Sequence, residues 1–249
     1  MGRIKQLLSA QIPGRGGLTR VAADLLIAKL HQSRAYDLVM RLPLLAWAVV
    51  CTIVWMSGLV GYVRNADPAL AGAVYAINIA MRLSSIAFLL LVATSVILRV
   101  RPSSRARGLE PRISALAGSF IVYAFGLFPR RDLSVPSEII STCLNLVGTG
   151  AAIFVLAQLG RSFSVMAEAR RLVTSGVYRC VRHPLYVAEE LATIGIFMQF
   201  LSVWTTLLLA AQIAFQLRRM HNEELVLTAT FPEYADYRRT TARLIPGIY

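Results

Sequence analysis

The chain is a series of long apolar runs separated by short polar or basic segments. About 20 consecutive apolar residues are enough for a helix to cross the hydrocarbon core of a bilayer. The pattern predicts four such helices, at about residues 42–63, 73–98, 113–128 and 137–159. These runs are typical of an integral membrane protein rather than of a soluble domain.

A further apolar run, residues 187–217, is too long for one membrane helix. Its 31 residues would form a helix of ~46 Å, whereas the hydrocarbon core is ~30 Å thick. Two shorter antiparallel arms that turn between about Gln199 and Trp204 fit better. The predicted fold class is therefore all-α, a polytopic membrane helix bundle with about six membrane-crossing arms, of which the last two form a hairpin.

The residues before the first predicted span are polar and basic. After a Gly/Pro-rich breaker at residues 13–17, residues 18–41 carry apolar side chains on one helical face. We predict an amphipathic helix lying on the cytoplasmic leaflet. A packed soluble helix is the alternative.

The net charge of +13 comes from 26 basic and 13 acidic residues. The segments predicted to be cytoplasmic hold 22 of the basic residues, the outer turns hold 3, and Arg82 is the remaining one. This bias predicts that both termini lie in the cytoplasm. It also favours attraction to anionic membrane lipids over binding of nucleic acid, because no basic stripe or aromatic stacking platform accompanies the charge.

One polar block stands out in this apolar chain, at residues 176–190. It contains Arg182, His183 and Pro184, followed by Glu189 and Glu190. Proline suits the first turn of a helix, so His183 is expected at the cap of a helix whose free N–H groups favour an anion. The alternative is that Arg182 and His183 only anchor a membrane helix at the lipid headgroups.

Residues 172–178 and the following Arg182-His183-Pro184-Leu185-Tyr186 resemble the signature of isoprenylcysteine carboxyl methyltransferases and their membrane relatives, including phosphatidylethanolamine N-methyltransferases. A second block, Glu223-Glu224 with residues 231–237 and 243–246, is similar to the same family. Together with residues 160–163, the resemblance covers roughly residues 140–249. It implies a methyltransferase core at 140–249. The residue pattern adds a basic interfacial extension at 1–41 and transmembrane helices at 42–139.

The resemblance implies S-adenosylmethionine as the cofactor and an active site on the cytoplasmic side, where the two blocks must meet. Arginine, histidine and helix N–H groups suit the carboxylate or ribose of the cofactor, glutamates suit its ammonium or hydroxyls, and tyrosines supply flat surfaces. The expected cofactor-binding residues are Tyr178, Arg182, His183, Pro184, Tyr186, Glu223 and Glu224.

The implied acceptor is lipophilic and reaches the site through the bilayer. An isoprenylcysteine-type carboxylate is the first expectation, and a phospholipid amine or a small hydrophobic thiol is the alternative. His183 and Arg219 are the expected catalytic residues. Arg219, with Arg161 or Arg82, is expected to bind the acceptor. An arginine such as Arg82 within a span costs roughly 3 kcal/mol, so it should either face a cavity or extend to the outer surface.

Three other readings are not favoured. A metal site from His183, His221 and the glutamate pairs has the wrong spacing for zinc or di-iron motifs, and Cys51, Cys143 and Cys180 show no paired spacing. No phosphate-binding glycine motif is present. A scaffold or transporter that has kept the fold without catalysis is the remaining alternative. The sequence leaves the oligomeric state open, and the host membrane as either a bacterial inner membrane or the endoplasmic reticulum.

Overall fold

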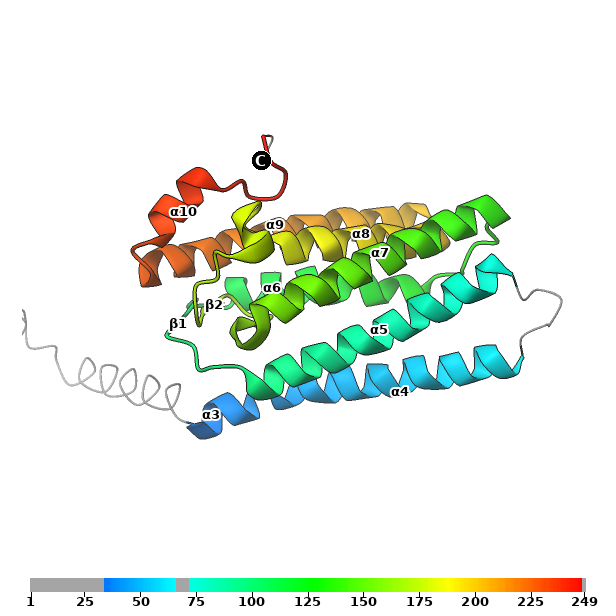
Figure 1. The fold of residues 1–249 in the computed structure, drawn as a ribbon, viewed down its shortest axis with the longest axis horizontal. Helices are drawn as coiled ribbons and strands as arrows, with labels where there is room; N and C mark the ends of the chain where they lie inside the picture. The colour runs from blue at the N-terminus through cyan, green and yellow to red at the C-terminus, as the bar shows by residue number, and fades with distance from the viewer. Residues whose placement is uncertain (1–33, 66–71, 248–249) are drawn as a thin grey trace, which may run out of the picture. The chain divides into compact units, whose positions relative to one another are not determined.

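The computed structural model describes residues 34–65 and 72–247 (Figure 1). The predicted amphipathic helix at residues 18–41 falls almost wholly outside the described residues. The chain divides into two units at Leu44. The described part of the first unit contains helix α3 (Arg34–Val39) and the start of α4 (Leu42–Arg64), with an ion pair of 2.6 Å between Arg41 and Asp37.

The described residues of the second unit form helices and one short pair of strands, with connecting loops. Three of the described helical segments are long and apolar enough to cross a membrane, at Asp37–Arg64, Val74–Leu98 and Val135–Ser162. They correspond to α4, α5 (Ala73–Leu98) and α7 (Val135–Leu159). The structure therefore supports an integral membrane protein of helices, and the count of six crossings stays a prediction.

The predicted span at 113–128 takes a different form. It consists of α6 (Glu110–Phe120) followed by a 3-10 helix at Ile121–Leu127. A β-carbon on Gly118 would lie 3.1 Å from the backbone nitrogen of Gln216. The glycine therefore lets α6 approach the helix that contains Gln216 more closely than any other residue would.

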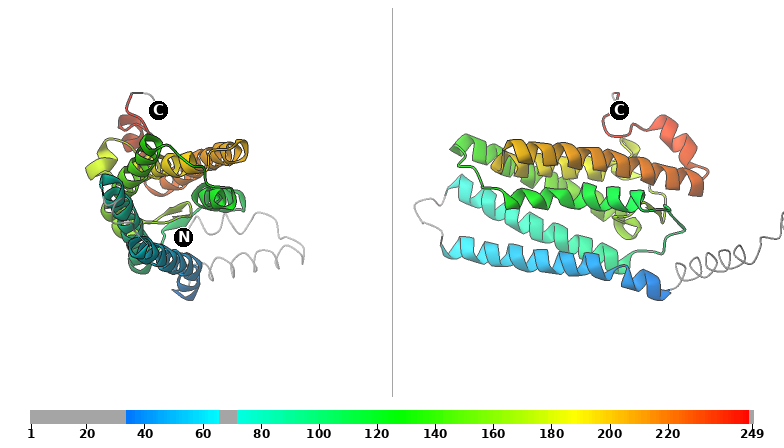
Figure 2. Two further views of the ribbon diagram at one scale, coloured as in Figure 1. Left: turned by 90° about the vertical axis from the view of Figure 1, so that its right-hand side faces the viewer. Right: turned by 180° about the vertical axis from the view of Figure 1, so that it is seen from behind.

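The long apolar run breaks where the pattern predicted a turn. Helix α8 (Pro184–Gln199) ends, and α9 (Val203–Thr230) begins after three intervening residues. The Ser202 hydroxyl accepts a hydrogen bond from the Thr205 backbone amide, and the Ser202 backbone amide donates one to the Thr205 hydroxyl. This capping box satisfies N–H groups at the start of α9. Figures 1 and 2 show α8 and α9 side by side.

Helix α7 packs along α8 through glycines and small polar residues. Gly148 on α7 faces Ala192, and Gly195 on α8 faces Ser141 and Asn145. The Ser141 hydroxyl donates to the Gly195 carbonyl at 2.8 Å. Close backbone contact through small residues is how helices gain packing energy in a membrane, where burial from water contributes little.

The remaining elements are short and lie where α8 begins and α9 ends. Strands β1 (Ser104–Arg105) and β2 (Glu168–Ala169) pair antiparallel. A 3-10 helix at Gly176–Arg179 leads into α8, and α10 (Tyr234–Thr240) follows α9. Through these elements the chain runs from the end of α7 to the start of α8, and from the end of α9 back to the same region.

The close glycine contact between α7 and α8 predicts that adding one methyl group affects stability differently at two nearby glycines of α7. Gly148→Ala should destabilise the protein by about 1–3 kcal/mol, because the new β-carbon would lie 2.4 Å from the backbone nitrogen of Ala192. Gly150→Ala, two residues away with no atom within 4 Å, is the control. It should be neutral or stabilise the helix by about 0.5–1 kcal/mol. Thermal unfolding in detergent measures both, and equal effects would contradict the packing described.

Candidate active site

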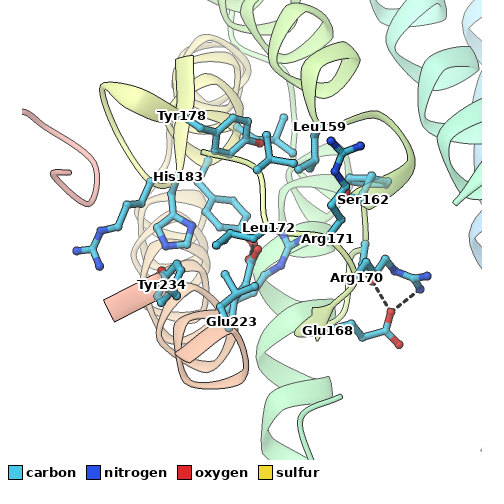
Figure 3. A pocket seen from close by; sticks show the side chains of 18 of the residues that line it. Leu159, Ser162, Glu168, Arg170, Arg171, Leu172, Tyr178, His183, Glu223 and Tyr234 are labelled. Atoms are coloured by element: carbon cyan, nitrogen blue, oxygen red, sulfur yellow. Dashed lines mark hydrogen bonds and ion pairs between the residues drawn. The ribbon is translucent and has the colours of Figure 1, made fainter. Parts of the chain in front are cut away.

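A pocket opens where α8 begins and the last turns of α9 run past it (Figure 3). The polar block before α8, the first turn of α8, the C-terminal part of α9 and α10 all contribute to its wall. Six of the residues expected from the sequence line it: Tyr178, Arg182, His183, Tyr186, Arg219 and Glu223. Its apolar lining includes Leu159, Phe163, Met166, Leu172, Leu185 and Leu227.

The carboxylate of Glu224 joins three segments of the chain behind this pocket. Its Oε1 lies 3.0 Å from Arg182 Nη1, 3.0 Å from His183 Nε2 and 3.3 Å from Arg243 Nε. Burial by itself would raise the pKa of Glu224, but the hydrogen bond to His183 and the charges of Arg243 and Arg182 hold that pKa below its ordinary value. Glu224 lies two turns beyond Leu217, where the apolar part of α9 ends.

The C-terminal segment also holds the polar block through its backbone. The amide of Arg182 donates to the carbonyl of Ala242 at 2.9 Å, and the amide of His183 donates to that of Arg243 at 3.1 Å. The Tyr237 hydroxyl donates to the Tyr178 carbonyl at 2.6 Å. The conformation of the block is thus fixed by residues some 60 positions later in the chain.

Gly176 provides the turn at which the block begins. Its φ of +63° lies in the left-handed region, which favours glycine. A β-carbon there would overlap the Gln158 side chain, and that side chain accepts a hydrogen bond from the Val177 amide at 3.0 Å. Helix α7 and the pocket loop are joined at this point.

Tyr186 is the residue through which the two sequence blocks meet inside the pocket. Its ring stacks on His183 with centroids 5.3 Å apart. Its hydroxyl donates to Glu223 Oε2 at 2.6 Å. The guanidinium carbon of Arg219 lies 4.8 Å from the ring centroid, within reach of a cation–π contact.

Arg219 is buried, with 3% of its surface exposed. Its Nη1 donates to the Ser119 hydroxyl of α6 at 2.8 Å and lies 3.5 Å from Gln216 Oε1. The carboxylates of Glu189 and Glu223 are close enough to act on it electrostatically. Arg219 is therefore held by hydrogen bonds and charges of the protein itself.

The opposite wall carries a second charged group, seen in Figure 3 as the pair Glu168 and Arg170. Glu168 Oε2 accepts from Arg170 Nη2 at 2.6 Å and from the Ser164 hydroxyl at 2.8 Å, and its Oε1 lies 3.0 Å from Arg105 Nε. Arg170 also donates to the Val100 carbonyl. This group ties the strand pair to the pocket wall.

Four of the expected site residues do not line the pocket. Glu224 and Pro184 lie behind it, Pro184 as the first residue of α8. Arg161 Nε donates to the Leu98 carbonyl at 2.9 Å. Arg82 lies over the Tyr62 ring, 4.8 Å from its centroid.

The sequence reading missed other residues that line the pocket. Tyr234 and Tyr237 belong to the second block and could have been found from that block, because both are aromatic residues beside its acidic residues. Arg170, Arg171 and Glu168 carry no motif signal.

The donor set fits S-adenosylmethionine. Two buried polar atoms of pocket residues, Arg182 Nε and the Tyr234 hydroxyl, make no well-aligned hydrogen bond among the described residues, although the two side chains interact with each other. Either could donate to a carboxylate or a hydroxyl group of a ligand. The apolar side chains listed above can cover a purine ring, and Glu223 can accept from an ammonium or a ribose.

The site and fold define a helical membrane protein with a polar pocket at one end of its helices. Residues 141–229 match the model of the isoprenylcysteine carboxyl methyltransferase (ICMT) family. The predicted resemblance is confirmed, and this part of the chain is ICMT-like. The match includes the first motif block and the two glutamates Glu223 and Glu224 of the second.

The chain is similar to curated proteins and to solved structures, of which two proteins and one structure serve as examples. The cobalt-zinc-cadmium resistance protein CzcN of Cupriavidus metallidurans is 35% identical over 98 residues, 37% of this chain and 45% of that protein. The protein-S-isoprenylcysteine O-methyltransferase of Schizosaccharomyces pombe is 31% identical over 133 residues, 47% of this chain and 56% of that protein. The chain thus spans about half the length of these relatives.

The solved structure is that of a eukaryotic intramembrane Ras methyltransferase, ICMT. It superposes with a TM-score of 0.43 and 16% identity, covering 93% of this chain and 86% of that one.

The Glu224 cluster predicts a stability difference that depends on pH. At neutral pH, Glu224→Gln should lower the free energy of unfolding by about 1.5–3 kcal/mol, the typical contribution of a hydrogen bond to a charged group. Because the folded-state pKa is lowered, the stabilisation is fully present above the ordinary glutamate value of 4.5 and is lost as the pH falls through the folded-state pKa. When unfolding is measured from pH 7 to pH 3, the free energies of unfolding of the parent protein and of Glu224→Gln should converge.

The control is Glu233→Gln, an exposed glutamate on the same segment, which should unfold like the parent protein at every pH. A constant difference between Glu224→Gln and the parent down to pH 3 would contradict the charge-based account.

Proposed function

We propose that this protein transfers a methyl group from S-adenosylmethionine to a lipophilic acceptor that enters from the bilayer. The observation that carries the proposal is that the Arg182-His183 block and the Glu223-Glu224 block lie together at one pocket. Their contact between His183 and Glu224 joins residues that are 41 positions apart in the chain. That pocket lies at the end of an apolar helix pair, where a membrane lipid and a water-soluble cofactor can both reach it.

The two sides of the pocket differ in charge in the way that this cofactor requires. On one side, Arg182 lines the pocket, and together with Arg243 behind it outnumbers the single carboxylate of Glu224, which suits the cofactor carboxylate. On the other side, Glu223 lines the pocket, and together with Glu189 outside the lining outnumbers Arg219, which suits a cationic group. S-adenosylmethionine would supply a methyl group already activated by a positively charged sulfur, so the protein has mainly to align the reactants and exclude water.

An isoprenylcysteine-type carboxylate is the first candidate for the acceptor. A carboxylate needs no general base at neutral pH, and Arg219 is a buried pocket arginine that could grip it at two points. Glu224 and Pro184 act in this proposal as positioning residues for Arg182 and His183 rather than as ligands.

An amine is the second candidate, and the charge around Arg219 favours it. An arginine that already faces Glu189 and Glu223 attracts an additional carboxylate less than an isolated arginine would. An amine acceptor must lose a proton before or during transfer. Glu223, which accepts a hydrogen bond from Tyr186, is the pocket carboxylate that could receive it.

We also propose that α8 and α9 are membrane arms and that the pocket faces the cytoplasm. The support is the excess of arginine in the segments on that side. Cysteines at Arg179 and Leu201, both exposed, would then be labelled from opposite sides of the membrane. Labelling from the same side would overturn the arrangement.

Binding of the cofactor is the direct test. Arg182→Gln and Glu223→Gln should each weaken S-adenosylmethionine binding by roughly 10- to 150-fold, the equivalent of about 1.5–3 kcal/mol for a lost charge-assisted hydrogen bond. Calorimetry on the purified protein measures this. Arg179→Gln, exposed in the same loop, should bind like the parent, and a parent protein that binds no cofactor would rule the proposal out.

The acceptor is tested through Arg219. With a carboxylate acceptor, Arg219→Lys should keep cofactor affinity within about threefold while turnover falls at least about tenfold, because lysine cannot form the two-point grip. Arg218→Lys is the matched control, since Arg218 is the exposed neighbour that pairs with Glu110 at 2.7 Å. Full turnover by Arg219→Lys would favour the amine acceptor, for which the grip is not needed.

A further inference from the structure

A stripe of polar side chains on α9 continues from the pocket into the apolar part of the helix pair. Gln212, Gln216, Arg219 and Glu223 follow one another at spacings of four, three and four residues, so they share one helical face. Gln212 is 3% exposed and lies about 16 Å along the helix from Glu223. Such a stripe is costly inside an apolar hairpin unless its groups have partners.

Most of the stripe is satisfied by α6 and α8. Gln216 Nε2 donates to Glu189 Oε2 at 3.0 Å, and Arg219 donates to Ser119. Gln212 Nε2 donates twice, to the Gly118 carbonyl at 3.1 Å and to Glu190 Oε1 at 2.8 Å. Both hydrogens of the Gln212 amide are therefore used.

Two oxygen atoms at the deep end remain without donors. Glu190 Oε2 and Gln212 Oε1 are buried and have no hydrogen-bond partner among the described residues. Turning the Gln212 amide round would not help, because its oxygen would then face the Gly118 carbonyl and Glu190 Oε1, which are both acceptors. The two atoms are therefore a pair of acceptors that needs a donor from outside the described structure.

The charges point to the kind of donor. Glu189 and Glu190 lie on successive positions of α8, and Arg219 is the buried cation that acts on Glu189. No cation is paired with Glu190 in the described residues. Glu190 as a whole is half-buried, but a buried carboxylate oxygen without a donor or a cation is unfavourable, so a ligand that brings both a positive charge and several N–H groups would satisfy the charge and the oxygens together.

We propose that Glu190 and Gln212 form a subsite, between α6, α8 and α9, for the protonated amine of an amphiphilic ligand. The subsite lies about 10 Å along α9 from Arg219. Identifying this ligand with the methyl acceptor rests on the proposed function, whereas the amine subsite itself does not. The acceptor would then be a lipid that carries an amine, and its apolar chain would extend into the bilayer.

Photolabelling tests the site with a defined probe. The probe is a hexadecylamine with a diazirine next to the amine, and the matched controls are the hexadecanoic acid and hexadecanol analogues. With the full-length protein in nanodiscs, the amine should label α6 and α9 near Gly118 and Gln212, identified by mass spectrometry. The acid and the alcohol should label these positions at least about tenfold less. Equal labelling by all three probes would overturn the proposal.

Glu190→Gln then distinguishes two cases: acceptor oxygens that lack a donor, and a protonated Glu190 that already donates to Gln212. In the proposed site, the new amide removes the charge and adds N–H donors beside Gln212, so amine labelling should fall at least about tenfold and the melting temperature should rise. If Glu190 is instead protonated and already bonded to Gln212, the substitution replaces one donor with another, and neither quantity changes. That result would also overturn the proposal.

Two further variants keep the test independent of folding and of the proposed function. Gln212→Leu should lose amine labelling, while Gln199→Leu, at the far end of α8, should label like the parent. S-adenosylmethionine binding, measured by calorimetry, should be the same in the parent, Glu190→Gln and Gln199→Leu. A parent that is labelled by the amine but binds no cofactor would remove the proposed function and leave the subsite standing. The reverse result would remove only the subsite.

Discussion

One carboxylate oxygen holds the candidate site together. Oε1 of Glu224 lies within 3.3 Å of nitrogens of Arg182, His183 and Arg243, which come from three separate segments of the chain. A buried carboxylate would be unstable without such partners, and the two half-buried arginines would be less stable without it. The start of α8, the end of α9 and the C-terminal segment are therefore fixed relative to one another by mutual neutralisation.

This arrangement leaves the pocket with two sides of different character. The side built on Glu224 has a surplus of positive charge, and its groups are held rigidly by backbone bonds from residues 242 and 243. The side built on Arg219 has a surplus of carboxylates and continues as the polar stripe of α9. A ligand with a carboxylate at one end and a cation at the other fits such a pocket by charge alone.

The sequence by itself determined the membrane helices and the neighbourhood of the site. Apolar length predicted α4, α5 and α7, and it predicted the break between Gln199 and Val203, because a 31-residue apolar run exceeds the thickness of the bilayer. The motif blocks contain five of the six expected residues that line the pocket, and the sixth, Arg219, lies four residues before the second block. These signals are local in the chain, so they can be read without knowing which helices touch.

The tertiary structure alone decided which polar groups face one another. The sequence suggested the same role for Glu223 and Glu224, yet one lines the pocket and the other is enclosed behind it by arginines, because neighbours on a helix point in directions about 100° apart. Arg82 lies against the ring of Tyr62 rather than in the pocket, because the packing of its helix decides which group it faces. Glu190 and Gln212 become a pair only when α8 packs beside α9, and no spacing along the chain records that contact.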